Sequence, residues 1–278
     1  MSIYVQPQSR HQLVMETSTN ALGPVDYDTA QHAGYARGRA LSAAAIQHYM
    51  QVFADRLPSR RPLVGVDLGA GVGRFTPALA ETFGGPVYGV EPSGRMRAVA
   101  EAEATHPRVR YLAGEGARMP LPDAQADFLL MFLSFHHFPD QRAAVTEIAR
   151  VVKPGGRVLL RSTFKERVPN HWWRAYFPRS QAVEEAMFPS VAEARALFEA
   201  GGFTTVELVE QEIPFEGDLA EAVARLKLRA VSVFEHMTEA ELQEGFEALD
   251  AALAAGTLEP RPTTGDVLVF SRASGAFG

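Results

Sequence analysis

The sequence predicts an α/β fold built on a doubly wound, mostly parallel sheet. Between Pro62 and Thr163, short apolar runs rich in β-branched residues alternate with helical stretches, a pattern typical of right-handed βαβ units. A glycine-rich turn from Gly69 to Gly73 follows the first apolar run and opens a helical stretch. The chain has 278 residues, of which 46% are hydrophobic, and this is enough for one large domain with a subsidiary cap.

The first half of the chain contains most of the expected elements. Residues 1 to about 28 are polar and weakly periodic, and a helix is expected from Thr29 to Leu57, where Pro58 ends it. The expected strands are Leu63 to Leu68, Val87 to Val90, Val109 to Leu112, Phe128 to Phe132 and Val158 to Ser162. The helices between them are Phe75 to Thr82, Met96 to Thr105 and Gln141 to Val152, the last ended by Lys153-Pro154-Gly155-Gly156.

The second half is expected to complete the sheet and to add helices. A helix from Val191 to Ala200 is closed by Gly201-Gly202, and strands follow at Phe203 to Glu212 and at Asp266 to Ser271. Two amphipathic helices, Leu219 to Phe234 and Glu239 to Ala255, lie between these strands. Such a pair fits either a cap over a pocket or an oligomerisation surface, for example that of a homodimer.

Composition and charge exclude several classes of protein. The net charge of −6 and the absence of a basic stripe argue against nucleic acid as a partner. The chain has no cysteine, which excludes disulfides, thiolate metal sites and cysteine nucleophiles. No apolar run approaches the ~20 residues that a membrane helix needs, and residues 1 to 19 lack a secretory signal. We therefore expect a cytoplasmic protein without a membrane partner.

The glycine turn alone fits two classes of nucleotide-binding enzyme. A dinucleotide fold spaces its glycines as G-x-G-x-x-G and places an acidic residue about 20 positions later. Here the third glycine, Gly73, comes one position earlier, Asp67 lies just before the turn, and Glu91 ends the second strand. A carboxylate at that position suits the hydroxyls of a ribose in both classes, so the placement of Asp67 is the more informative feature.

Four motifs in register resemble the class I S-adenosylmethionine-dependent methyltransferases, in particular the broad subgroup that includes ubiquinone and menaquinone C-methyltransferases. They cover about Pro62 to Thr163 and consist of Val66-Asp67-Leu68-Gly69-Ala70-Gly71-Val72-Gly73, Val90-Glu91-Pro92-Ser93, Gly114-Glu115-Gly116-Ala117-Arg118-Met119-Pro120-Leu121-Pro122-Asp123 and Val151-Val152-Lys153-Pro154-Gly155-Gly156. The resemblance implies S-adenosylmethionine as the cofactor and no metal. It also implies a Rossmann-like seven-stranded sheet of order 3-2-1-4-5-7-6 whose last strand is antiparallel.

The same resemblance implies which residues contact the cofactor. The methionine part would lie on the backbone from Asp67 to Gly73, Glu91 would bind the ribose hydroxyls, and Glu115 and Gly116 would contact the adenine. The family more often has Asp at the position of Glu115 and Ala at that of Gly116. The full set implied for the cofactor is Tyr35, Arg39, Asp67, Gly69, Ala70, Gly71, Gly73, Glu91, Pro92, Glu115, Gly116, Phe132 and Leu133.

Tyr35 and Arg39 enter this set because Tyr27, Asp28, Tyr35 and Arg39 resemble a Tyr…Tyr-x-x-x-Arg pattern that many members carry before the core. Residues four apart share a helical face, so Arg39 would reach the methionine carboxylate while Tyr35 covers it. The alternative is an exposed arginine beside a packed tyrosine.

Four side chains are candidates for proton transfer: His136, His137, Glu166 and His171. The two adjacent histidines follow the fourth strand, at the carboxyl edge of the sheet where ligands bind. A His pair at this place occurs in family members with unrelated acceptors, which favours a packing or pocket role over catalysis. Arg161 is either an attractant for an anionic acceptor or a solvated charge.

The aromatic stretch His171-Trp172-Trp173-Arg174-Ala175-Tyr176-Phe177-Pro178 fits an apolar box for the acceptor, or equally a buried cap core or a dimer contact. We expect an N-terminal arm and cap helix over residues 1–58 and a methyltransferase domain over 59–278, with cap insertions at about 164–190 and 217–257. The function expected is methyl transfer to a small-molecule acceptor. An NAD-linked oxidoreductase and a non-catalytic S-adenosylmethionine-binding regulator are the alternatives.

Overall fold

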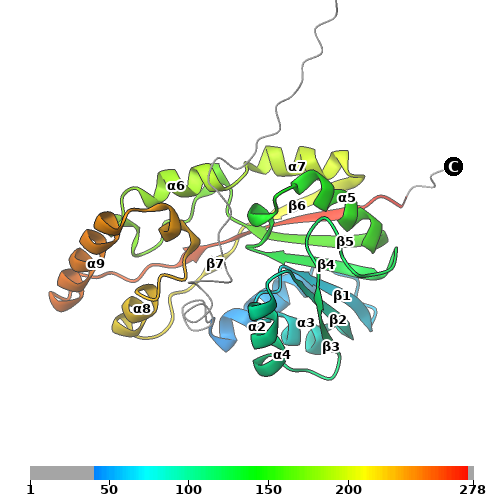
Figure 1. The fold of residues 1–278 in the computed structure, drawn as a ribbon, viewed down its shortest axis with the longest axis horizontal. Helices are drawn as coiled ribbons and strands as arrows, with labels where there is room; N and C mark the ends of the chain where they lie inside the picture. The colour runs from blue at the N-terminus through cyan, green and yellow to red at the C-terminus, as the bar shows by residue number, and fades with distance from the viewer. Residues whose placement is uncertain (1–40, 275–278) are drawn as a thin grey trace, which may run out of the picture.

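The computed structural model describes residues 41–274, which form a sheet covered by helices and a separate group of helices beside it (Figure 1). The sheet has seven strands in the order β3-β2-β1-β4-β5-β9-β6. Its strands are β1 (Leu63–Leu68), β2 (Gly84–Glu91), β3 (Val109–Ala113), β4 (Ala126–Phe132), β5 (Val152–Ser162), β6 (Phe203–Val209) and β9 (Asp266–Arg272). β9 runs antiparallel to both β5 and β6, and the predicted order 3-2-1-4-5-7-6 is therefore confirmed.

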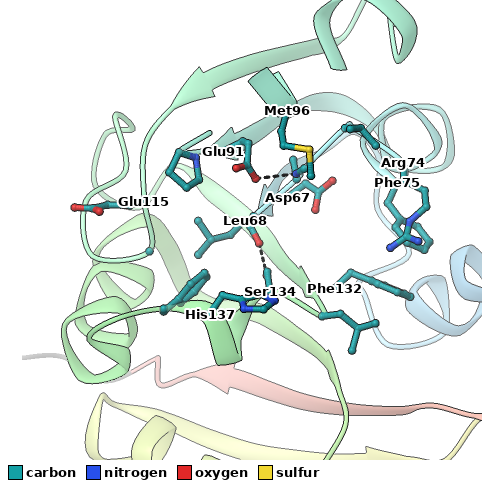
Figure 2. Close-up of a pocket in the computed structure, with 18 of the residues that line it drawn as sticks. Asp67, Leu68, Arg74, Phe75, Glu91, Met96, Glu115, Phe132, Ser134 and His137 are labelled. Carbon is teal, nitrogen blue, oxygen red and sulfur yellow. Dashed lines mark hydrogen bonds between the residues drawn. The ribbon is translucent and has the colours of Figure 1, made fainter. Parts of the chain in front are cut away.

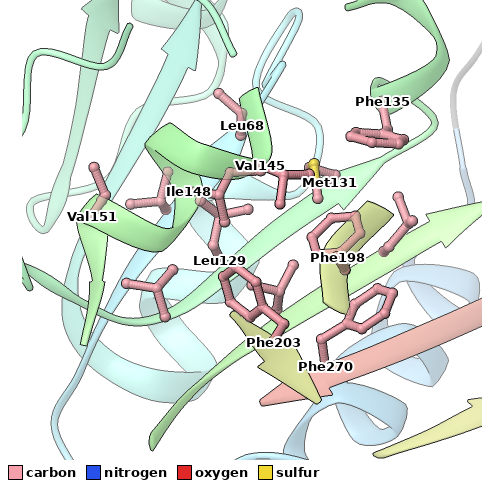
Figure 3. Packing of buried hydrophobic residues seen from close by; sticks show 14 of the residues in the cluster. Leu68, Leu129, Met131, Phe135, Val145, Ile148, Val151, Phe198, Phe203 and Phe270 are labelled. Carbon is pink, nitrogen blue, oxygen red and sulfur yellow. The ribbon is translucent and has the colours of Figure 1, made fainter. Parts of the chain in front are cut away.

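Apolar residues on both sides of the central strands create two cores. On one face, Leu129 and Met131 of β4 contact α5 (Gln141–Val151) and α7 (Val191–Ala200), and Phe198 stacks on Phe270 at 4.1 Å (Figure 3). On the other face, Phe128 and Leu130 pack with α2 (Ala43–Ala54) and α3 (Thr76–Phe83). Burial on both faces explains why these strands are nearly continuous apolar runs in the sequence.

Helices α2, α3 and α4 (Gly94–Glu103) gather below the sheet in Figure 1, and α5 and α7 lie above it. A third apolar cluster holds α6 (Ser180–Met187), α8 (Leu219–Leu226) and α9 (Glu239–Ala254) together at one side. The short helices η3 (Arg174–Tyr176) and η4 (Ser232–His236) also contribute to this cluster, which we call the cap cluster. The remaining short helices are η1 (Phe135–His137) and η2 (Lys165–Arg167).

Several predicted boundaries are wrong for identifiable reasons. Of the helix expected from Thr29 to Leu57, the described residues contain α2, which ends at Ala54 and has Ser42 as its N-cap: the Ser42 backbone is extended and its hydroxyl accepts a hydrogen bond from the Ala45 amide at 3.0 Å. Residues 29–40 of the expected helix lie outside the described residues. The helix expected from Leu219 to Phe234 ends at Leu226, because Arg229 adopts a left-handed backbone with φ of 53°. Arginine rarely adopts that conformation, so the sequence gives no warning of the break.

The strand expected from Phe203 to Glu212 is also divided. β6 ends at Val209, and β7 (Glu212–Ile213) pairs instead with β8 (Thr263–Thr264), which was not predicted. At the other end of the sheet, the Lys153-Pro154-Gly155-Gly156 segment does end a helix, but it belongs to the long strand β5, since Val152 already pairs with Ala126.

Candidate active site

A cavity of about 550 Å³ opens at the carboxyl edge of β1, β2 and β4 (Figure 2). This is the edge at which ligands bind in open α/β sheets. Most of the lining comes from the turn after β1, the end of β2, the loop around Glu115, and the segment after β4. The lining residues are Leu41, Asp67, Leu68, Gly69, Ala70, Gly71, Val72, Arg74, Phe75, Glu91, Pro92, Met96, Glu103, Ala104, Glu115, Gly116, Phe132, Leu133, Ser134, His137, Phe138 and Pro139.

The glycine turn holds its shape through backbone contacts and two close approaches. The amides of Gly69 and Ala70 both donate to the Val90 carbonyl, at 2.8 and 3.2 Å. Gly69 has a φ of 75°, and a Cβ there would overlap the side chain of Ser134. Gly73 has a φ of 79°, and a Cβ there would overlap Tyr111. Only glycine satisfies both requirements, so the turn brings bare backbone to the cavity wall.

Two buried carboxylates flank this turn. Glu91 accepts hydrogen bonds from the Gly71 amide and the Ser93 amide, both at 2.9 Å, so its carboxylate is fixed at the end of β2. Burial raises the pKa of Asp67 to about 6, although the Thr76 hydroxyl donates to this carboxylate at 2.7 Å and opposes the shift. Both groups line the cavity, and they are the acidic side chains that the sequence singled out.

The adenine-contact candidates lie at the opposite rim. Glu115 is exposed and points outward at the edge of the cavity in Figure 2. Gly116 is buried, and a Cβ there would lie 2.7 Å from a ring carbon of Phe138. Phe138 therefore fills the space that the more usual alanine methyl would take.

The segment after β4 forms the wall facing the glycine turn. The Ser134 hydroxyl donates to the Leu68 carbonyl at 2.7 Å, which ties this wall to β1. Leu133 adopts a left-handed backbone with φ of 54°, an uncommon conformation for leucine that often occurs at functional sites. The ring of Phe132 stacks on that of Phe75 at 4.1 Å, with the Arg74 guanidinium 5.3 Å from each ring centre.

The four candidates for proton transfer do not lie together in one site. His137 lines the cavity, whereas His136 is buried behind it, with its ring 3.8 Å from that of His137 and 4.3 Å from that of Phe188. Glu166 is exposed and accepts a hydrogen bond from the Val191 amide at 2.8 Å, at the start of α7. His171 stacks on Trp173 at 5.0 Å. Of the four, His137 alone is among the cavity-lining residues that the structure describes.

The structure narrows the alternatives left open for the aromatic stretch after β5 and for Arg161. Trp173 and Phe177 are buried in the cap cluster, where Phe177 contacts Phe234 at 4.9 Å, and neither lines the cavity. Of the three roles considered for this stretch, these contacts agree with a buried cap core. Arg161 is not a solvated charge, since only 6% of it is exposed.

Arg74, Phe75 and Met96 line the cavity but were not predicted from the sequence. Arg74 and Phe75 directly follow the glycine turn, and that position at the start of a helix was the available signal. Met96 of α4 lines the cavity because α4 begins immediately after Glu91-Pro92-Ser93. Tyr35 and Arg39, together with Tyr27 and Asp28, lie outside the described residues.

Comparison with known proteins gives this arrangement a family. Residues 66–160 match the methyltransferase domain family. The fold and this match support a class I S-adenosylmethionine-dependent methyltransferase domain over this part of the chain. It is therefore a methyltransferase, and its cofactor is S-adenosylmethionine.

Individual relatives of this methyltransferase agree with the family. Demethylmenaquinone methyltransferase of Bacillus licheniformis is 29% identical over 177 residues, which span 56% of this chain and 75% of that protein. A probable chloroplastic tocopherol O-methyltransferase of Oryza sativa subsp. japonica is 33% identical over 105 residues, 36% of this chain but only 29% of the rice protein. The fold is shared with a putative methyltransferase from an antibiotic biosynthesis pathway of Anabaena variabilis. The TM-score is 0.68 at 23% sequence identity, and the match covers 80% of this chain and 96% of that protein.

Residues 41–274 of the methyltransferase contain neither a cluster of metal-ligating side chains nor a membrane-spanning helix. No group of three or more histidine, cysteine, aspartate or glutamate side chains in that range is placed to hold a metal ion. Over the same range, no helix is both long and apolar enough to cross a membrane.

Proposed function

We propose that the methyltransferase transfers the methyl group of S-adenosylmethionine to a small organic molecule and releases S-adenosylhomocysteine. The observation that carries the proposal is the single cavity in which the glycine turn, the Glu91 carboxylate and the Phe132 to Ser134 segment face one another. Its volume of about 550 Å³ falls within the range of about 300–1,000 Å³ that is usual for small-molecule sites.

The fit to the cofactor rests on the cradle around Gly71. Its φ is 57°, and a Cβ there would meet no other atom within 4 Å, so this part of the turn faces open space. We assign the methionine part to the backbone of Gly69, Ala70, Gly71 and Gly73, with Phe132 and Leu133 opposite. Glu91 with Pro92 would hold the ribose, and Glu115 with Gly116 would hold the adenine.

The bound cofactor supplies a methyl group on a sulfonium, which is transferred by in-line displacement. The protein's part is to align the acceptor about 3 Å from that methyl carbon and to exclude water. His137 is the candidate to accept a proton from the acceptor, because its ring lines the cavity. We assign His136 a packing role behind His137 and Glu166 a capping role at α7.

The relatives' names suggest quinones and phenols as acceptors, since the comparisons include a demethylmenaquinone and a tocopherol methyltransferase. We propose a cytoplasmic protein that acts on small molecules and not on nucleic acid, in keeping with its net charge of −6. We also propose that residues 164–190 and 217–257 form a cap on a methyltransferase domain spanning 59–278. The N-terminal arm of residues 1–58 and a homodimer are proposed on the sequence pattern alone.

Calorimetry with S-adenosylhomocysteine tests the cofactor site. Asp67→Ala and Glu91→Ala should each abolish detectable binding or weaken it by about 100-fold, because each removes a buried carboxylate from the cavity. Glu101→Ala is the matched control, since Glu101 is exposed on α4 and does not line the cavity. Unchanged affinity in both site variants would overturn the assignment.

Transfer of labelled methyl groups tests the acceptor. The purified protein is incubated with methyl-labelled S-adenosylmethionine and a fractionated cell extract. Label recovered in small organic molecules is the expected result. Label found only in the protein or nucleic-acid fractions would contradict a small acceptor.

A further inference from the structure

Arg161 is a buried cation at the carboxyl end of β5, beside the cavity. In the sheet it pairs with Phe132 of β4 on one side and with Val267 of β9 on the other. Its carbonyl accepts a hydrogen bond from the Leu133 amide at 2.9 Å, and both Phe132 and Leu133 line the cavity. Arg161 therefore lies directly behind two residues of the cavity wall, one strand further along the sheet.

Three uncharged groups hold this guanidinium in place. Its Nε donates to the Tyr49 hydroxyl at 3.2 Å, and its Cζ lies 5.1 Å from the centre of the Phe132 ring. A Cβ built on Gly265 would lie 2.5 Å from Nη2, so the backbone before β9 approaches the guanidinium as closely as only glycine allows. These contacts come from α2, β4 and the loop before β9, and they fix the position of the group without balancing its charge.

Two other shielded arginines, Arg174 and Arg150, have acidic partners. Arg174 is buried and pairs with Glu184, and the partly buried Arg150 pairs with Glu147 at 2.7 Å. Asp266, a buried carboxylate at the start of β9, accepts from Arg167 Nε at 2.7 Å. Within residues 41–274, no aspartate or glutamate forms an ion pair with Arg161. An uncompensated buried charge is costly, which makes it a candidate for ligand binding.

The strand order assigns the two ends of the site to different ligands. Along the carboxyl edge, the proposed ribose group Glu91 ends β2, the glycine turn follows β1, Phe132 ends β4, and Arg161 lies near the end of β5. The acidic end suits the hydroxyls of the cofactor. The basic end lies on the side of β4 away from Glu91, next to the proposed site of the methionine part.

We infer that the methyl acceptor carries a carboxylate and that Arg161 binds it. This inference rests on the proposed function, since it concerns the acceptor of the same site. A guanidinium presents N–H groups in a plane that matches the two oxygens of a carboxylate, and the Arg161 Nε donates to the uncharged Tyr49 hydroxyl and not to an acid. Phe132 provides an apolar surface between the carboxylate site and the glycine turn.

Paired neutral and anionic probes test the inference. The probes are salicylate and salicylamide, anthranilate and anthranilamide, and phenylacetate and phenylacetamide, each titrated into protein saturated with S-adenosylhomocysteine. Wild type should bind at least one acid about tenfold more tightly than its amide, as expected for a hydrogen bond between charged groups. Arg161→Met should lose that preference and keep its affinity for S-adenosylhomocysteine.

Two further variants make the result decisive. Arg157→Met removes an arginine from the middle of the same strand, four residues before Arg161, and should keep the preference for acids. Arg161→Lys retains the charge and should still bind the acids more tightly than the amides, by a smaller factor than wild type. If Arg161→Met does not fold, an unchanged preference in Arg161→Lys would overturn the inference. Equal binding of acids and amides by wild type, or an unchanged preference in Arg161→Met, would overturn the inference.

The same experiment separates this inference from the proposed function. Acids that bind in an Arg161-dependent way without receiving labelled methyl groups support the carboxylate site and count against these probes as acceptors. Methyl transfer to amides as fast as to acids supports the proposed function and overturns the role of Arg161.

Discussion

Asp67 has an environment that differs strongly from that of an ordinary carboxyl group. Its side chain is buried at the end of β1, and burial raises its pKa to about 6 from a model-compound value of 3.8. The folded protein therefore binds the proton more tightly than the unfolded chain does. As pH rises from about 4 to about 6, the cofactor-free protein loses stability, because the buried group must ionise.

Asp67→Asn is expected to stabilise the cofactor-free protein while it weakens cofactor binding. At about pH 8 the gain in unfolding free energy should be up to about 3 kcal/mol, and it should shrink at about pH 5, where the wild-type carboxyl is mostly protonated. Urea unfolding at the two pH values measures this effect. A variant less stable than wild type at the higher pH would contradict it.

Gly116 and Phe138 share one space at the cavity rim, because the Phe138 ring occupies the position that a side chain at residue 116 would take. Gly116→Ala should weaken binding of S-adenosylhomocysteine about tenfold, because the new methyl group would press on the Phe138 ring from 2.7 Å and displace it or the loop. Adding Phe138→Leu should restore part of the affinity, and a double-mutant cycle measures the coupling.

Gly94→Ala is the control for that prediction, because the nearest atom to a Cβ there is an Arg97 side-chain nitrogen at 3.8 Å. Additive effects of the Gly116 and Phe138 substitutions would show that the two positions do not share one space.

The sequence places residues well where their position follows from the end of a strand. Asp67, Gly69 and Glu91 lie together at the cavity, because each lies at or just after the carboxyl end of β1 or β2; their contacts with the cofactor stay a prediction. Glu166 and Arg161 were ambiguous, because their surroundings come from distant segments: Glu166 contacts the start of α7, and Arg161 contacts Tyr49 and Phe132. No local pattern reports such partners.

At the scale of elements, α5 supports the loop that carries Glu115. Arg150 donates to the carbonyls of Leu121 at 2.8 Å and Met119 at 3.2 Å, and Glu147 accepts from the Met119 amide at 2.7 Å. The paired charges keep the pKa of Glu147 below its usual value, mainly through the Arg150 hydrogen bond. One helix face therefore fixes the shape of a loop at the cavity rim.

Arg150→Met should weaken S-adenosylhomocysteine binding about tenfold, although Arg150 does not line the cavity, because the loop loses two backbone anchors. Arg142→Met, on an exposed position of the same helix, should leave the affinity unchanged. Calorimetry on both variants makes the comparison, and equal affinities would show that the loop holds its shape without Arg150.

Elements that the local sequence marks with an apolar run or with capping residues were predictable. Elements that depend on contacts with distant segments were not. β1 and α7 match their expected bounds, Leu63 to Leu68 and Val191 to Ala200, because a short apolar run marks β1 and the capping residues Ser190 and Gly201 mark the ends of α7. β8 has only two residues, and it forms because β7 lies beside it. α6 was not expected, since its buried side belongs to the cap cluster and not to the sheet.

For the whole molecule, Asp127 joins three segments at the amino edge of the sheet. Its buried carboxylate accepts from Arg60 and Lys153, each at 2.8 Å, and from the Val64 amide at 2.8 Å. These hydrogen bonds lower the pKa of Asp127 against the opposing effect of burial. Lys153 of the Lys153-Pro154-Gly155-Gly156 motif thereby has a structural role far from the cavity.

Asp127→Asn should lower the unfolding free energy by roughly 2–4 kcal/mol at neutral pH and leave S-adenosylhomocysteine affinity unchanged. Because the folded pKa lies below the unfolded one, this stabilisation is present above about pH 4 and is lost as pH falls through the folded pKa. Asp250→Asn, which breaks the exposed pair with Lys227, should cost less than about 1 kcal/mol. Equal effects of the two substitutions in urea unfolding would contradict the prediction.

The order of the strands has a consequence for synthesis on the ribosome. Within the described sheet, β6 is hydrogen-bonded to β9 alone, and β9 is separated from it along the chain by the helices of the cap cluster. The nascent chain therefore carries β6 and the outer edge of β5 unpaired until residues 266–272 emerge. Exposed strand edges of this kind favour aggregation, so β9, which is translated after the other strands of the described sheet, also protects the newly made protein from association with its neighbours.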